Sequence, residues 1–256
     1  MLRQTIGLAA LTAGLGFTAT AVVTSPPAAP VPVIVELFTS EGCSSCPPAD
    51  AVLASLVETQ PVKGAMVIAL SEHVDYWDRL GWRDPFSNHI FTQRQSAYAT
   101  ASAAGEVYTP QMIIDGGRAI VGSDRAAAEA AIARASARAK APLFLTLSSQ
   151  APPVLSIDVP PGPATTGAQV TLAIVEDGLA SAVKGGENTG HVLRHAAVTR
   201  RFVPLGRVDK DRGLSREMPL DLDPQWKRAA LHAVVIVQAA TVGPVVAAGS
   251  VRLEAR

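Results

Sequence analysis

The chain has 256 residues, of which 22 are Lys or Arg and 22 are Asp or Glu, so its formal net charge is zero when histidine is neutral. This length allows one large domain or two ordinary ones, each with its own buried core. The basic residues form no long run, which argues against a nucleic-acid groove or a polybasic membrane patch. With two cysteines in the whole chain, disulfides are not what holds such a fold together.

Residues 1–30 are predicted to be a signal peptide followed by a linker. Arg3 precedes an apolar stretch at residues 6–23, and a Pro/Ala-rich segment comes next. This is the pattern of a secretory signal, with Ala-Thr-Ala at 19–21 as a candidate cleavage site; the stretch is also about long enough for an uncleaved membrane anchor. We therefore expect a periplasmic or secreted protein, in a compartment where a disulfide can form.

Residues 31–141 show strand and helix patterns in turn, which predicts an α/β domain. The first two strands are apolar without clean alternation, as expected for strands covered on both faces. A turn signal follows the third strand, and Ser123 is the expected N-cap of the last helix. The expected strands are Val31–Phe38, Ala65–Leu70, Gln111–Asp115 and Ala119–Val121, and the expected helices are Pro47–Val57, Phe91–Ala104 and 124 to about 140.

The composition changes at Pro142, and residues 142–256 are predicted to be a second, mostly β, sandwich-like domain. Apolar residues alternate with other residues in several segments, and Pro/Gly turns separate these segments. The alternating sets are Leu143, Leu145 and Leu147, then Val170, Leu172 and Ile174, and later Leu231, Ala233, Val235 and Val237.

The two cysteines, Cys43 and Cys46, form a C-x-x-C motif between the first strand and the first helix. Thioredoxin-like folds carry out dithiol–disulfide exchange at such a turn. A disulfide across three residues closes too small a loop to stabilise much, so redox chemistry explains the pair better. We expect Cys43 to start the helix and be the nucleophile, with Cys46 resolving the mixed disulfide. Inert thiols or half of a zinc site are the alternatives.

Two further features accompany the cysteines. Thr109-Pro110, directly before a strand, is expected to be a cis peptide that brings backbone beside the reactive sulfur, where an extended substrate can pair with it. A proline that opens a strand also has simpler explanations, because it needs no ladder partner there. Glu36 is a candidate proton acceptor for Cys46 if its carboxyl is buried with a raised pKa; otherwise it pairs with a base or reaches water.

An aromatic loop is predicted at residues 71–87, with His73, Trp77 and Trp82. It leaves the sheet at the edge that carries the C-x-x-C, where ligands of parallel sheets gather. These side chains therefore serve either substrate binding or packing of the loop. His73 and the two cysteines are also a candidate copper site. The polar segment 184–195 is expected to be a structured loop without a catalytic role.

With these motifs in view, the chain resembles the DUF1223 family of secreted bacterial proteins, whose members have a thioredoxin-like N-terminal half. The resemblance implies that fold and export. The chain differs from better-known thioredoxins, because no Trp precedes Cys43 and Ser44-Ser45 separates the cysteines. The matching stretches are residues 35–50, 73–78, 80–82, 108–112, 115–116, 186–188 and 193–195.

The sequence thus predicts a thioredoxin-like domain with an inserted aromatic loop, followed by a β-rich domain. The predicted activity is exchange of disulfides with protein thiols or disulfides through Cys43 and Cys46, with no cofactor and no resident metal. A non-catalytic binding protein that presents Trp77 and Trp82, and a copper carrier that adds His73 to the cysteines, are the alternatives.

Overall fold

The computed structural model describes residues 29–102, 105–150 and 152–253. The predicted signal peptide and its alternative, a membrane anchor, lie outside the described residues. Among the helices of the described ranges, none is both long and apolar enough to cross a membrane.

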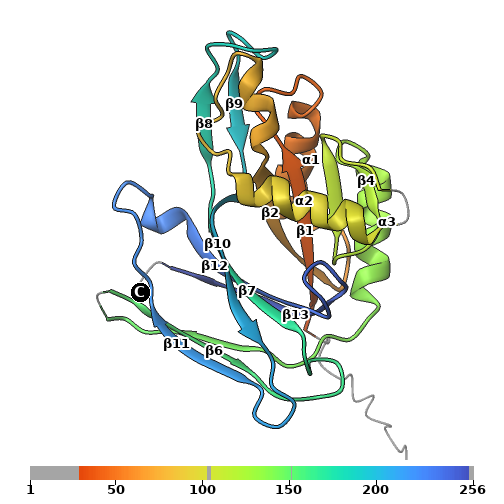
Figure 1. Cartoon of the computed structure of the whole chain (residues 1–256), viewed down its shortest axis with the longest axis vertical. Helices are drawn as coiled ribbons and strands as arrows, with labels where there is room; N and C mark the ends of the chain where they lie inside the picture. Colours follow the sequence, from red (N-terminus) through yellow and green to blue (C-terminus); the bar gives the residue numbers. More distant parts are fainter. Residues whose placement is uncertain (1–28, 103–104, 151, 254–256) are drawn as a thin grey trace, which may run out of the picture.

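An eight-stranded mixed sheet forms the centre of the molecule (Figure 1), in the order β13-β12-β7-β10-β2-β1-β3-β4. β1 and β2 pair in parallel along their whole length, whereas β3 pairs antiparallel with β1. Both predicted segments, 31–141 and 142–256, contribute strands, and they meet where Val198 of β10 pairs with Ser71 of β2. The strands are β1 (Val31–Thr39), β2 (Ala65–His73), β3 (Gln111–Ile114), β4 (Ala119–Val121), β7 (Gln169–Glu176), β10 (Val198–Arg207), β12 (Leu231–Gln238) and β13 (Val245–Arg252).

Helices cover both faces of the first half of this sheet. α1 and α3 share one apolar cluster with Val35 and Leu37 of β1, while α2 packs with Phe38 in another. Successive side chains of a strand point to opposite faces, so β1 is apolar on both. The helices are α1 (Pro47–Thr59), α2 (His89–Ala101), α3 (Arg125–Ser136) and the short 3-10 turns η1 (Asp75–Leu80) and η2 (Arg228–Ala230).

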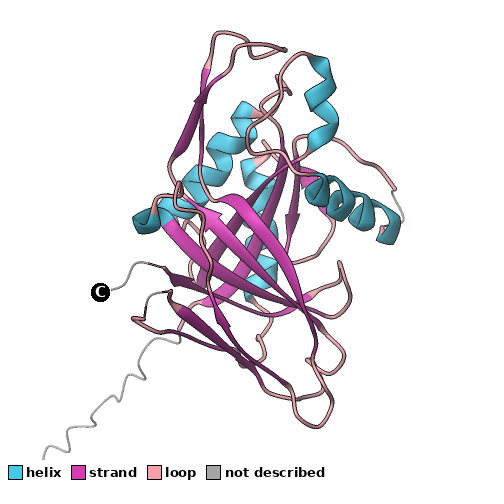
Figure 2. Cartoon of the chain, turned by 60° about the vertical axis from the view of Figure 1, so that its left-hand side comes forward, coloured by secondary structure: helices cyan, strands magenta, loops and turns pink. Residues whose placement is uncertain are grey.

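The second half is mostly β, and its predicted alternation is confirmed. Leu172 and Val235 face a cluster closed by a three-stranded sheet, while Ala173 and Val234 face the core of the first half. Figures 1 and 2 show that smaller sheet below the large one. A separate hairpin reaches the end of the molecule where α1 lies. The remaining strands are β5 (Phe144–Leu147), β6 (Val154–Val159) and β11 (Leu214–Pro219) in the small sheet, and β8 (Leu179–Ala182) and β9 (Val192–His195) in the hairpin.

Several predicted boundaries are wrong, each for a local reason. The second strand does not end at Leu70: it runs on to His73, because pairing with β1 and β10 outweighs the polar character of these residues. The last helix begins after Asp124, not Ser123, because the Asp124 carboxylate caps the N–H of Ala127.

Of the other two helices, α2 begins earlier than predicted, whereas α1 begins at Pro47 as its apolar spacing predicted, but without Cys43 at its start. α2 starts two residues before Phe91, since the side chain of Asn88 caps it. α1 takes Cys46 as its N-cap residue, with prolines at its first positions, so Cys43 lies in the turn before the helix and not at its start. Proline fits the first helical turn, where its missing N–H would have no helical partner.

Candidate functional site

A disulfide joins Cys43 and Cys46 in the turn between β1 and α1. Backbone hydrogen bonds shape this turn: the N–H of Cys43 donates to Ser40 O, and the N–H of Cys46 donates to Cys43 O. At Gly42 a Cβ atom would lie 3.1 Å from the Cβ of Trp77, so glycine allows the turn to approach η1 closely. The turn that holds the disulfide is therefore fixed by its own backbone and by the aromatic loop.

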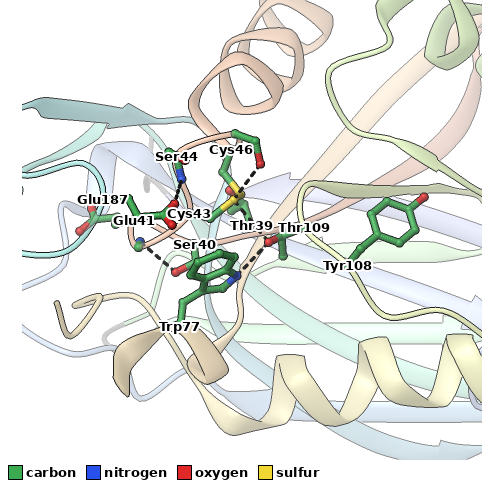
Figure 3. The surroundings of a disulfide bond; sticks show 12 residues. Thr39, Ser40, Glu41, Cys43, Ser44, Cys46, Trp77, Tyr108, Thr109 and Glu187 are labelled. Atoms are coloured by element: carbon green, nitrogen blue, oxygen red, sulfur yellow. Dashed lines mark hydrogen bonds between the residues drawn. A yellow bond between two sulfur atoms is a disulfide. The ribbon is translucent and has the colours of Figure 1, made fainter. Parts of the chain in front are cut away.

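Thr109 and Trp77 lie beside the disulfide (Figure 3). The Thr109 hydroxyl donates to Cys43 Sγ at 3.4 Å, and Trp77 Nε1 donates to the same hydroxyl at 2.9 Å. The Thr109–Pro110 peptide is cis, as expected. Of the predicted site residues, the structure thus brings together both cysteines, the Thr-Pro pair and one tryptophan.

A loop of the second half contacts the turn that holds the disulfide. Asn188, between β8 and β9, donates from its side chain to the carbonyl oxygens of Glu41 and Cys43, at 2.8 and 3.0 Å. Nearby, Ser44 N donates to Glu187 Oε2 at 2.9 Å, and hydrogen bonding from Ser44 lowers the pKa of that carboxyl. Both cysteines are 0% exposed, while Ser44 between them is exposed. The segment that was predicted to be a structured loop without a catalytic role thus contacts the turn that holds the disulfide.

Glu41 is the centre of a buried network under the turn. Its carboxylate accepts hydrogen bonds from Trp82 Nε1 at 2.8 Å, His195 Nε2 at 3.0 Å and the hydroxyl of Ser181. Its backbone N–H donates to Asp84 at 2.8 Å. Trp82, a predicted binding residue, therefore anchors the aromatic loop from inside.

His73 lies in the same network. Its Nδ1 is 2.7 Å from Asp84 Oδ2, and its ring contacts that of His195 edge-on, with centroids 4.8 Å apart. Burial acts to raise the pKa of Asp84, but His73 and the backbone N–H groups of Glu41 and Phe86 outweigh it, so this pKa is lowered. Within the described residues, no three His, Cys, Asp or Glu side chains are grouped so that they could hold a metal ion.

Asp50, one turn into α1, is the strongly perturbed acid of the site. Its Oδ1 accepts a hydrogen bond from Thr39 at 2.9 Å, and its Oδ2 lies 3.8 Å from His195 Nδ1. Burial raises the pKa of Asp50 to about 7, aided by the charges of Asp84 and Glu41 and opposed by His195 and Thr39. A carboxyl with such a pKa can gain and lose a proton near neutral pH.

Glu36 does not reach the cysteines by any hydrogen bond that the structure describes. It lies on the face of the sheet covered by α2, where its carboxylate accepts from Arg94 Nε and from the hydroxyl of Tyr98 at 2.7 Å. Cys46 precedes α1, which packs on the other face. The arrangement matches the alternative of a carboxylate paired with a base.

Sequence reasoning missed Glu41, Asp50 and the contributions of Asn188 and His195. Glu41 lies two residues before Cys43 and Asp50 four residues after Cys46, and in the sequence both look like ordinary turn and helix acids. Asn188 and His195 belong to stretches that carry the family resemblance, which was the one available signal for them.

Comparisons with known proteins give a family and two solved structures. A sequence model of the family described as "Protein of unknown function (DUF1223)" matches residues 34–238. The crystal structure of protein AGR_C_4864 from Agrobacterium tumefaciens is 26% identical, with a TM-score of 0.69 over 89% of this chain and 97% of that one. HBP35 of Porphyromonas gingivalis is similar in fold alone, at 15% identity and a TM-score of 0.59, over 89% of this chain and 77% of that one. No curated protein matches the chain.

Proposed function

This chain belongs to the DUF1223 family, and we propose that it is an exported thiol–disulfide oxidoreductase with a thioredoxin-like first half. One observation carries the proposal: a Cys43–Cys46 disulfide sits in a strand-to-helix turn with the Thr109 hydroxyl hydrogen-bonded to Cys43 Sγ. This bond marks Cys43 as the sulfur beside which a substrate chain would lie. Its protein substrates are thiols or disulfides of the exported compartment.

The exchange runs through a mixed disulfide at Cys43. A thiolate of a protein dithiol attacks Cys43 Sγ, the bond to Cys46 breaks, and Cys46 leaves as a thiolate that takes up a proton. The second substrate thiolate then attacks the substrate sulfur of the mixed disulfide and releases Cys43. Two electrons have passed from the substrate to the cysteine pair; starting from the reduced pair and a substrate disulfide, the same steps run in reverse.

Burial of both sulfurs sets a condition on this chemistry. Because each cysteine is 0% exposed, a protein thiolate reaches Cys43 only after covering groups move. The loop with Glu187 and Asn188 is held to the turn by three hydrogen bonds, so it can be displaced without unfolding the sheet. We infer that a matching partner opens the site and that exchange is slower with general disulfides.

The test is a trap for the mixed disulfide. Cys46→Ser, expressed with its native leader, should accumulate complexes with exported proteins that dissolve on reduction, and Cys43→Ser/Cys46→Ser should give none. Purified wild-type protein should also reduce a peptide disulfide with dithiothreitol as electron donor. An empty trap together with no reduction above the dithiothreitol background would overturn the proposal. Sequencing the N-terminus of the periplasmic or secreted fraction tests export in the same cells.

The same burial favours a second candidate, a non-catalytic binding protein. In that case Cys43→Ser should leave partner pull-down intact, whereas Trp77→Ala, which removes the indole from the edge beside Thr109, should weaken it. Loss of binding in Cys43→Ser with binding retained in Trp77→Ala would exclude this candidate.

A further inference from the structure

Asp50 lies one helical turn after Cys46, and its backbone N–H donates to Cys46 O at 3.1 Å. Helical side chains tilt towards the N-terminus, and residues four apart are neighbours on the helix surface. The Asp50 carboxyl is therefore directed to the Cys46 end of α1, where Thr39 holds one of its oxygens. Asp50 is therefore the buried acid that follows Cys46 by one helical turn and lies on the same side of the helix.

The other oxygen of Asp50 faces His195, which lines a cavity of about 430 Å³ between α1 and the β8–β9 hairpin. Glu58 and Arg194 line the same cavity and are exposed, so it opens to the surface. His195 Nδ1 has no hydrogen-bond partner among the described residues, and Nε2 is held by Glu41. His195 thus connects a buried acid to a cavity lined by elements other than those around Thr109.

We propose that Asp50 exchanges a proton with Cys46 in each half-reaction, and that His195 links Asp50 to the cavity beside α1. The proposal deepens the proposed function and rests on it. When Cys46 leaves as a thiolate, protonated Asp50 gives it the proton and becomes a carboxylate. When Cys46 resolves a mixed disulfide, the carboxylate takes the thiol proton, and the new thiolate attacks Cys43 Sγ and expels the substrate thiolate.

A separate route for the proton is needed because the substrate occupies the Cys43 side of the disulfide during the step. Acid–base catalysis works best when the pKa of the group lies near the working pH. Burial brings Asp50 there, with Glu41 and Asp84 raising its pKa and His195 lowering it. Exchange of a proton through the His195 imidazole lets Asp50 gain or lose its proton while the substrate covers the Cys43 side of the disulfide.

The experiment uses reduced full-length protein and Ellman's reagent, which forms a mixed disulfide with one cysteine and releases a second coloured thiolate when the other attacks. The rate of this second release is measured against pH. Asp50→Asn should slow it about 100-fold near pH 7 and move its midpoint towards that of an ordinary thiol, about 8.5. His195→Gln should move the midpoint of Asp50 upward by about one unit, because the opposing charge is lost.

Two variants serve as controls. Glu129→Gln removes a partly exposed acid on α3, and His89→Gln removes an exposed His that is also paired with an Asp; both should keep the wild-type profile. If Asp50→Asn and His195→Gln also keep it, the inference is overturned while the proposed function stands. If wild-type protein reacts with the reagent but transfers no disulfide to peptides, the proposed function fails instead. Should Asp50→Asn not fold, the His195→Gln profile decides.

Discussion

Two buried polar clusters lie on different sides of β1, and they differ in what neutralises their acids. The Arg94 cluster lies under α2, where Arg94 contacts two buried carboxylates and Gln238 of β12. The His195 cluster lies under the disulfide-bonded turn, where histidines face the acids. The members of the Arg94 cluster are Glu36, Glu72, Arg94, Tyr98 and Gln238. The members of the His195 cluster are Glu41, Asp50, His73, Asp84 and His195.

Because of this difference, the two clusters differ in what they can do. An arginine keeps its charge at every working pH, so Glu36 has a permanent partner. Glu72 shares this one cation with Glu36. Burial and the charge of Glu36 raise the pKa of Glu72 well above the ordinary value, and Arg94 opposes this. In the His195 cluster the groups that face the acids are imidazoles, whose ring nitrogens can either donate or accept a hydrogen bond. The first cluster can hold elements together, and the second can also move a proton.

The largest effect should come from breaking the Arg94 cluster. Arg94→Met leaves the Glu36 carboxylate buried without its cation, which should lower the free energy of unfolding by about 3–5 kcal/mol. Urea unfolding measures this change. The control is Arg125→Met, which breaks an exposed ion pair with Glu129 on α3 and should cost less than about 0.5 kcal/mol. The rate of disulfide exchange per folded molecule should not change. Slower exchange with unchanged stability would mean that the Arg94 cluster serves the chemistry and does not stabilise the fold.

The next effect is a pH dependence of stability that belongs to Asp50. Its pKa is about 7 in the folded protein against 3.8 for an ordinary Asp, so the folded state binds the proton more tightly. The resulting stability is fully present below pH 3.8 and is lost as the pH rises to about 7, by up to about 4 kcal/mol. In Asp50→Asn this loss should be absent. Unfolding with the disulfide intact, at several pH values, measures it, and parallel curves for variant and wild type would contradict it.

A smaller effect concerns access to the disulfide. Asn188→Ala removes two buried hydrogen bonds that hold the covering loop to the backbone of Glu41 and Cys43. Loss of about 1–2 kcal/mol from the closed state should speed reduction of the disulfide by dithiothreitol about tenfold. Thr189→Ala, which removes a hydroxyl that donates to Gly186 O within the same loop, is the matched control. Equal rates in both variants would mean that this loop does not limit access.

The sequence predicted what depends on neighbours in the chain. Alternation predicted the strand faces at Leu172 and Val235, and the C-x-x-C lies in the predicted turn between a strand and a helix. The partners of the two buried clusters could not be predicted in this way. Arg94 lies 58 residues from Glu36, and His195 lies 154 from Glu41, and no period in the sequence encodes such contacts.

Two expectations, for Cys43 and for Glu36, depended on where each residue lies within its element. Cys43 was expected at the start of the helix, where the dipole favours a thiolate, but it lies in the turn before α1, because the two prolines fit best at the first helical positions and the helix begins at Pro47. Glu36 was expected either to accept a proton from Cys46 or to pair with a base or reach water. Which outcome applies depends on the face of β1, and a strand apolar on both faces does not reveal it.

The smallest expected effect tests whether burial, and not charge, holds the covering loop. Glu187 accepts a hydrogen bond from Ser44 N but is fully exposed, and hydrogen bonding to the side chain and backbone of Ser44 lowers its pKa. Water replaces an exposed hydrogen bond easily, so Glu187→Gln should change the rate of reduction by dithiothreitol less than about twofold, at low and high salt alike. A rate that rises as strongly as in Asn188→Ala would place control of the site in the exposed charge. Access to Cys43 would then depend on an exposed carboxylate, which ionic strength can screen, in addition to the two buried clusters.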